Sequence, residues 1–144
     1  MLTAASRMRA PALAFVAVLA LASPALADVV ARVSIASQRM VLIVDGEVEA
    51  VWKVSTAGRG YHTPRGSYRP KVLRRMHYSS KYENAPMPHS VFFRGGYAVH
   101  GTDHVRSLGR PVSHGCIRLA PRNAATLYHL IRQHGLRATR IIIG

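Results

Sequence analysis

The sequence predicts a mainly β fold, a compact sandwich-like or barrel-like arrangement of mixed sheets with one α-helix near the C-terminus. Two observations favour this class. Short runs rich in Val and Ile recur along residues 29–143, separated by turn signals that contain glycine. Only one stretch, at about residues 121–134, repeats apolar residues at helical spacing.

The first strands are expected to include a hairpin. Residues 29–35 and 39–44 are short apolar runs, and Asp45-Gly46 then leads into residues 47–55, where apolar and charged residues largely alternate. An Asp-Gly pair between two such runs is a strong hairpin signal. A further strand is predicted at residues 67–73.

The middle of the chain combines strands with an expected long loop. Residues 90–93 and 97–100 are predicted to be strands joined through Gly95-Gly96. Residues 74–89 show little apolar periodicity and are expected to form a loop. Loops of this length in compact domains are usually functional, so we hypothesise that residues 74–89 form a lid.

The predicted helix has clear start and stop signals. Pro121 suits the first helical position, and Gly135 follows the last periodic residue. Its apolar face comprises Ala124, Leu127, Tyr128, Leu130 and Ile131. A final strand is expected at residues 139–143.

The first 27 residues resemble a signal peptide. Arg7 and Arg9 form a positive start, residues 10–22 are apolar, and residues 25–27 read Ala-Leu-Ala, a cleavage signal. An uncleaved N-terminal anchor is the alternative, although a spanning helix needs about 20 apolar residues. We therefore expect residues 28–144 to be exported to the periplasm or cell wall as one domain without a transmembrane segment.

The chain is strongly basic. Lys and Arg number 20 against 6 Asp and Glu, which gives a formal net charge of +14. Such a charge favours anionic partners: nucleic acid, anionic lipid or an acidic cell-wall polymer. Because export is expected, no nucleic-acid partner is predicted.

Chemistry-bearing residues concentrate in residues 97–119. This segment holds Cys116, the only cysteine of the chain, and three of its eight histidines. A neighbouring imidazole can take the proton of a thiol and make the sulfur a nucleophile. Zinc binding by His100, His104, His114 and Cys116 is an alternative, although their spacing is awkward for one tetrahedral ion. A third possibility is that Cys116 is a buried, unreactive side chain. We expect neither a metal nor a cofactor.

Two motifs in this segment resemble the L,D-transpeptidase (YkuD-type) family. They are His100-Gly101 and Ser-His-Gly-Cys-Ile-Arg at residues 113–118. The segments Ser-Thr-Ala-Gly at residues 55–58 and Thr-Pro-Arg-Gly at residues 63–66 are similar to further family segments, and the resemblance covers about residues 30–143. The Thr-Pro-Arg-Gly segment is given no catalytic role, since simple turn chemistry explains it equally well.

The resemblance implies roles for individual residues. Cys116 would be the nucleophile, His100 its general base, and the carbonyl of Gly101 would orient the imidazole. The implied oxyanion hole comprises the backbone N–H groups of His114, Gly115 and Cys116. The residues implied to support the site or bind substrate are Arg118, Ser113 and His114.

The resemblance also implies a function, peptidoglycan L,D-transpeptidation. Cys116 would attack the third residue of a tetrapeptide stem, expel D-alanine and form a thioester. If the amine of another stem attacks this thioester, the product is a 3→3 crosslink. If a lysine of an envelope protein attacks it, the product is a protein–peptidoglycan tether. If water attacks it, the reaction is that of an L,D-carboxypeptidase. A non-catalytic wall-binding module is the remaining alternative. Family members often carry extra domains, and this sequence is expected to be a bare catalytic domain attracted to anionic wall polymer by its charge.

Overall fold

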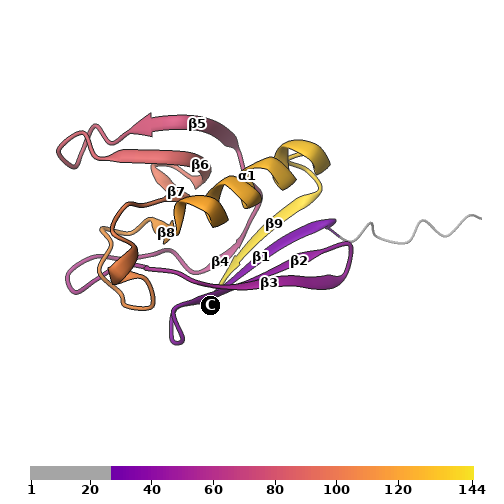
Figure 1. Ribbon diagram of the computed structural model, residues 1–144, viewed down its shortest axis with the longest axis horizontal. Coiled ribbons are helices and arrows are strands. Elements are labelled where there is room, and N and C mark those ends of the chain that lie inside the picture. Colours follow the sequence, from indigo (N-terminus) through magenta and orange to yellow (C-terminus); the bar gives the residue numbers. More distant parts are fainter. Residues whose placement is uncertain (1–26) are drawn as a thin grey trace, which may run out of the picture.

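The computed structural model describes residues 27–144, so the predicted signal peptide at residues 1–27 lies almost wholly outside the described residues (Figure 1). Within that range the chain forms nine strands, one α-helix and the short 3-10 helix η1 (Val105–Ser107). The mainly β class and the single helix near the C-terminus are confirmed.

Five strands form the first sheet. Their order is β3 (Glu47–Lys53), β2 (Arg39–Val44), β1 (Val29–Ser34), β9 (Thr139–Ile143) and β4 (Gly66–Tyr68). β1 and β9 run parallel, and the other pairs are antiparallel. The predicted Asp-Gly hairpin joins β2 to β3: Asp45 and Gly46 both have positive φ, at 49° and 83°, as the favoured two-residue turn requires.

Four strands form the second sheet, in the order β5 (Val72–Tyr78), β6 (Pro86–Arg94), β7 (Tyr97–Gly101) and β8 (Ile117–Leu119). β7 and β8 are parallel, and the other pairs are antiparallel. Both sheets are therefore mixed, as expected. They are open sheets that do not close into a barrel, which corrects the barrel-like part of the prediction.

The prediction of a loop at residues 74–89 is wrong for most of that range. Residues 72–78 and 86–94 form the β5–β6 hairpin, and only residues 79–85 connect the two strands. β5 is the edge strand of its sheet and largely exposed, so it lacks the apolar alternation of a half-buried strand. Pro86 and Pro88 are compatible with β6 because β7 pairs with β6 only from Val91 onward, which leaves that side of the strand open.

The helix α1 (Pro121–His134) packs between the two sheets (Figure 1). Ala124, Leu127, Tyr128 and Ile131 are its buried residues, so the predicted apolar face is largely confirmed. Pro121 is the first helical residue, and Gly135, at φ 99°, closes the helix by donating to the carbonyl of Ile131. No helix within residues 27–144 has both the length and the apolar character needed to span a membrane.

Candidate active site

Parallel pairing of β7 with β8 brings His100 and Cys116 to one face of the four-stranded sheet. Val99 pairs with Ile117, and His100 pairs with Arg118. Side chains alternate between the faces of a sheet. Val99 and Ile117 are buried in the core, so His100, Arg118 and the residue just before β8, Cys116, face the opposite side.

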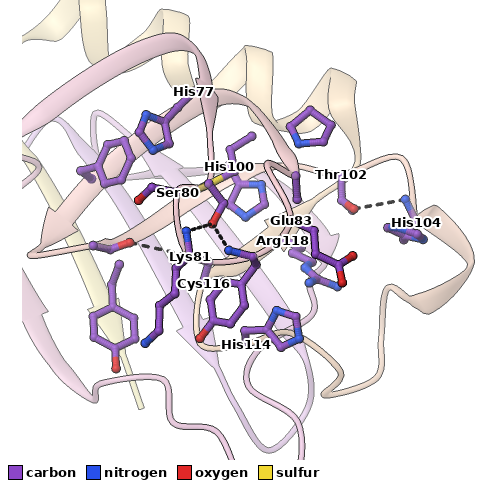
Figure 2. A pocket seen from close by; sticks show the side chains of 18 of the residues that line it. His77, Ser80, Lys81, Glu83, His100, Thr102, His104, His114, Cys116 and Arg118 are labelled. Carbon is purple, nitrogen blue, oxygen red and sulfur yellow. Dashed lines mark hydrogen bonds between the residues drawn. The ribbon is translucent and has the colours of Figure 1, made fainter.

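This opposite side carries a cavity of about 980 Å³ (Figure 2). His100, His114, Cys116 and Arg118 line it, so four of the residues implied by the resemblance meet there. Most of the loop at residues 79–85 lines the same cavity. Figure 2 shows Ser80, Lys81 and Glu83 of this loop beside these residues. The part of the hypothesised lid that remains a loop thus borders the site.

The imidazole of His100 is oriented by a backbone carbonyl. Its Nδ1 lies 2.7 Å from the carbonyl oxygen of Gly101, so a protonated Nδ1 donates to that oxygen and leaves the lone pair on Nε2. His100 is only 6% exposed. Burial, followed by the positive charges of Arg118 and His77, lowers the pKa of His100 to about 4, against the opposing effect of the Gly101 hydrogen bond. The imidazole is therefore neutral at pH 7 and free to accept a proton.

The thiol of Cys116 is partly buried, and its Sγ lies 3.8 Å from the carbonyl oxygen of Gly96. Burial raises the pKa of Cys116, and a backbone hydrogen bond from Ala98 and the charge of Arg118 only partly offset this. At rest both Cys116 and His100 are neutral. Attack by the sulfur therefore requires the thiol proton to leave during the reaction, and a neutral imidazole is the group that can receive it.

Ser113 stabilises the loop that carries Cys116 through two hydrogen bonds. Its hydroxyl donates to the carbonyl of Cys116 at 2.6 Å and accepts from the N–H of Gly115 at 3.1 Å. Ser113 is 1% exposed and is not among the residues within 27–144 that line the cavity, so its hydroxyl supports the loop and does not face the cavity, as its implied role in substrate binding would require. Because the N–H of Gly115 is engaged by Ser113, the N–H groups of His114 and Cys116 are the better candidates for an oxyanion hole.

Thr63 supports the same loop from a distant segment, and sequence reasoning missed it. Its hydroxyl donates to the carbonyl of Gly115 at 2.8 Å and accepts from the N–H of Ala57 at 2.9 Å. The signal was present in the Thr-Pro-Arg-Gly segment, to which no catalytic role was given. A role in positioning the loop is an addition to the turn chemistry expected there.

Gly115 itself occupies a position that only glycine fits. Its φ of 130° lies in a region that L side chains rarely adopt. A Cβ there would lie 2.8 Å from both the carbonyl oxygen of His62 and Cε1 of Tyr97. The backbone before Cys116 is therefore enclosed on both sides.

Arg118 and His114 both line the cavity, and each is held by neighbouring residues. The backbone N–H and carbonyl of Arg118 pair with Ser55 at 2.9 and 3.1 Å, which fixes β8 from its second side. Across residues 27–144 the ion pairs are His–Asp pairs alone, so no carboxylate lies within 4.0 Å of the Arg118 guanidinium. The imidazole of His114 stacks on Tyr82 with centroids 4.1 Å apart and also contacts Tyr61 at 4.7 Å.

The zinc alternative is not supported by the geometry. In the described part of the chain, the one set of three or more His, Cys, Asp or Glu ligand atoms within 4.8 Å of each other comprises Asp28, Asp45 and His134, outside this cavity. His104 is exposed and lies 3.5 Å from Asp103. His100, His104, His114 and Cys116 thus do not converge on one point.

Comparison with known proteins agrees with the fold and the motifs. The family model of the L,D-transpeptidase catalytic domain (YkuD) matches residues 28–143. No curated protein sequence matches the chain at a significant level.

Several solved structures resemble the chain. An L,D-transpeptidase from Mycobacterium smegmatis has 28% identity and a TM-score of 0.73, over 81% of this chain and 58% of that one. One from Xylanimonas cellulosilytica has 28% identity and a TM-score of 0.65, over 85% and 63%. One from Stackebrandtia nassauensis has 25% identity and a TM-score of 0.71, over 85% and 58%. The chain thus spans less than two thirds of each.

Proposed function

The chain belongs to the family of L,D-transpeptidase (YkuD) catalytic domains, and from this premise we propose that it is a peptidoglycan L,D-transpeptidase that acts through a thioester on Cys116. The observation that supports the proposal most directly is the placement of His100 and Cys116 on neighbouring strands, facing one cavity. Its substrate is the peptide stem of peptidoglycan.

Acylation begins with a neutral pair. The sulfur of Cys116 attacks the carbonyl carbon of the third stem residue while Nε2 of His100 takes the thiol proton. The C–S bond forms, the bond to the terminal D-alanine breaks, and the proton on His100 passes to the departing amine. The Gly101 carbonyl, 2.7 Å from Nδ1, holds the imidazole in the required tautomer and stabilises the transient imidazolium.

Backbone donors stabilise the oxygen anion that develops during attack. We assign this role to the N–H groups of His114 and Cys116, because Ser113 already engages the N–H of Gly115. One such donor typically contributes about 2.7–4 kcal/mol to transition-state stabilisation. Arg118, which lies beside His100 and has no carboxylate partner within residues 27–144, binds a carboxylate of the stem.

An acceptor then resolves the thioester. The amine of another stem gives a 3→3 crosslink, a lysine of an envelope protein gives a tether, and water gives a tripeptide. All three follow the same acylation, so the identity of the acceptor is a separate question. The substrate requires export, and we propose that residues 1–27 are the signal peptide that directs the chain to the periplasm or cell wall.

The test is a disaccharide-tetrapeptide donor incubated with residues 28–144 and with the Cys116→Ala variant. We expect release of D-alanine and a covalent adduct, seen by intact mass, with the cysteine form only. Dimeric products identify stem amines as acceptors, whereas tripeptide alone identifies water. D-alanine release that survives Cys116→Ala would contradict the assignment of the nucleophile, and no release by either form would contradict the proposed activity.

A further inference from the structure

A second, smaller cavity adjoins the candidate active site. Its volume is about 400 Å³, and its lining comprises Lys71, Val72, Arg74, His77, Phe92, Arg94 and Gly95. His77 and Phe92 line both cavities. Their rings are in edge-to-face contact, with centroids 5.1 Å apart, and form the boundary between the two spaces. The two cavities are therefore neighbours that share this pair of rings as a common wall.

The fold holds the walls of the smaller cavity in place. Val72 pairs with Phe92 across the β5–β6 hairpin, and the backbone N–H of Lys71 donates to the carbonyl of Phe92 at 2.8 Å. Arg94 ends β6, and its guanidinium lies 3.4 Å from the hydroxyl of Tyr68, which accepts a hydrogen bond from it. Two strands and the turn at Gly95 thus present an apolar floor with a basic rim.

The charge of this rim has one sign. Lys71, Arg74 and Arg94 line the cavity, and no Asp or Glu of the described residues does. Within residues 27–144, neither ion pair involves any of the three. Like charges that share a small cavity repel one another, and a bound anion relieves that repulsion. The rim therefore has the chemistry of a site for an anionic group.

We propose that this basic rim (Lys71, Arg74 and Arg94) is a subsite for a carboxylate of the same peptide that enters the active-site cavity. The inference rests on the proposed function, which supplies a substrate with several carboxylates. The shared wall of His77 and Phe92 favours the peptide over a phosphate-bearing wall polymer, since a polymer attracted by overall charge would not require a cavity next to the catalytic one. Arg118 would hold one carboxylate beside Cys116, and the rim a more distant one.

The test uses binding, so that it does not depend on turnover. In a Cys116→Ala background, the triple variant K71Q/R74Q/R94Q is compared with R32Q/R39Q/K53Q, which removes the same charge from exposed positions on β1, β2 and β3. The probes are a stem tetrapeptide with free side-branch carboxylates and the same peptide with those carboxylates amidated. Calorimetry gives the affinity of each.

We expect the rim variant to bind the free-carboxylate peptide about tenfold more weakly and the amidated peptide almost unchanged, because three partly solvated charge contacts together contribute on the order of one tenfold step. The control variant should change either affinity by less than about twofold. Equal losses in the two variants, or equal losses for the two peptides, overturn the subsite. Preferential competition by a polyglycerol phosphate over the peptide would also overturn it.

Failure of the proposed function gives a different pattern. If the cysteine-containing protein releases no D-alanine but the rim substitutions still weaken binding of the free-carboxylate peptide and not of the amidated one, the subsite stands and the transpeptidase assignment falls. If D-alanine is released, the rim variant should raise KM for the free-carboxylate donor about tenfold and leave kcat unchanged. Turnover by the rim variant with an unchanged KM would contradict the subsite but not the proposed activity.

Discussion

The hydroxyl of Thr63 donates a 2.8 Å hydrogen bond to the carbonyl oxygen of Gly115, the residue that precedes Cys116. The described part of the chain has no cis peptide bond, and in a trans peptide the carbonyl and the following N–H point in opposite directions. This one contact therefore fixes the direction of the Cys116 N–H, a proposed oxyanion donor. Thr63 in turn is held by the N–H of Ala57 at 2.9 Å.

Replacing Thr63 by Val keeps the shape of the side chain but removes both hydrogen bonds. A buried donor or acceptor left unpaired costs about 1–3 kcal/mol, so we expect a loss of that order in the free energy of unfolding. Because the Cys116 N–H loses its fixed direction, kcat for D-alanine release should fall by about tenfold or more while KM changes little. Denaturant unfolding and steady-state kinetics measure the two effects.

Thr63→Ser is the matched control, since it restores the hydroxyl. It should recover most of kcat even if packing around the lost methyl group lowers stability. A Thr63→Val protein that is less stable but keeps its full kcat would show that the residue is only structural.

The lowered pKa of His100 predicts how stability depends on pH. Above pH 6.5 the imidazole is neutral in both the folded and the unfolded chain, so it contributes no slope. Between pH 6.5 and about 4 the unfolded chain binds a proton that the folded chain excludes. The free energy of unfolding therefore falls as the pH drops through this window, by up to about 3 kcal/mol.

Urea unfolding across this pH range checks the slope. His100→Gln should remove this contribution, whereas His104→Gln, at an exposed position, should keep it. The same pKa sets the acid limb of kcat/KM, whose midpoint we expect nearer pH 4 than 6.5. An acid limb centred at 6.5 would mean that His100 is not buried as a neutral base.

Local signals made much of the fold predictable, and long-range pairing limited the rest. Asp45-Gly46 and the start and stop signals of α1 act over a few residues, and the structure has both the hairpin and the helix where they indicate. The edge strand β5 had no such signal because its exposed face needs no apolar residues. Its sequence therefore looked like part of a loop.

The site divides in the same way. The spacing within Ser113–Arg118 and the preceding His100 was readable as a motif, and the register of β7 with β8 brings His100, Cys116 and Arg118 to one cavity. The contact of Thr63 with Gly115 joins residues 52 positions apart; the Thr-Pro-Arg-Gly segment marks Thr63, but no local pattern names its partner. The motif indicated Ser113 as a residue that supports the site or binds substrate, and only the structure shows that its hydroxyl faces the loop's own backbone.

Gly115→Ala tests how tightly the backbone before Cys116 is enclosed. The substitution combines an unfavourable positive φ with a Cβ 2.8 Å from two neighbouring atoms. Strain at a non-glycine residue in such a region costs on the order of 1–3 kcal/mol, and the steric clash adds to it. We expect clear destabilisation in thermal unfolding and loss of D-alanine release.

Gly46→Ala separates the two causes. Gly46 also has a positive φ, 83°, but no atom of the described residues 27–144 lies within 4 Å of its added Cβ, and it sits in the distant β2–β3 turn. Gly46→Ala should therefore lower the free energy of unfolding only by the cost of the positive φ, on the order of 1–2 kcal/mol, and should leave turnover normal. Equal destabilisation by the two substitutions would contradict the close packing of Gly115 against His62 and Tyr97.

The stacking of Tyr82 on His114 predicts that the loop at residues 79–85 is held over the cavity by an aromatic contact. The rings are 4.1 Å apart at an interplanar angle of 26°, and Tyr61 contacts both of them. Such a ring pair contributes about 0.5–1.5 kcal/mol beyond its buried area. Tyr82→Ala should therefore raise the open population of the loop by about two- to tenfold.

Trypsin reports this opening, because Lys81 lies in the loop and is exposed. We expect faster cleavage after Lys81 in Tyr82→Ala, and slower cleavage in the Cys116→Ala protein when stem peptide fills the cavity that the loop borders. Tyr78→Ala is the matched control, since Tyr78 is an exposed tyrosine at the end of β5, outside the Tyr61–Tyr82–His114 contacts. Equal acceleration by both substitutions would mean that the hairpin, and not the stack on His114, controls access to the site.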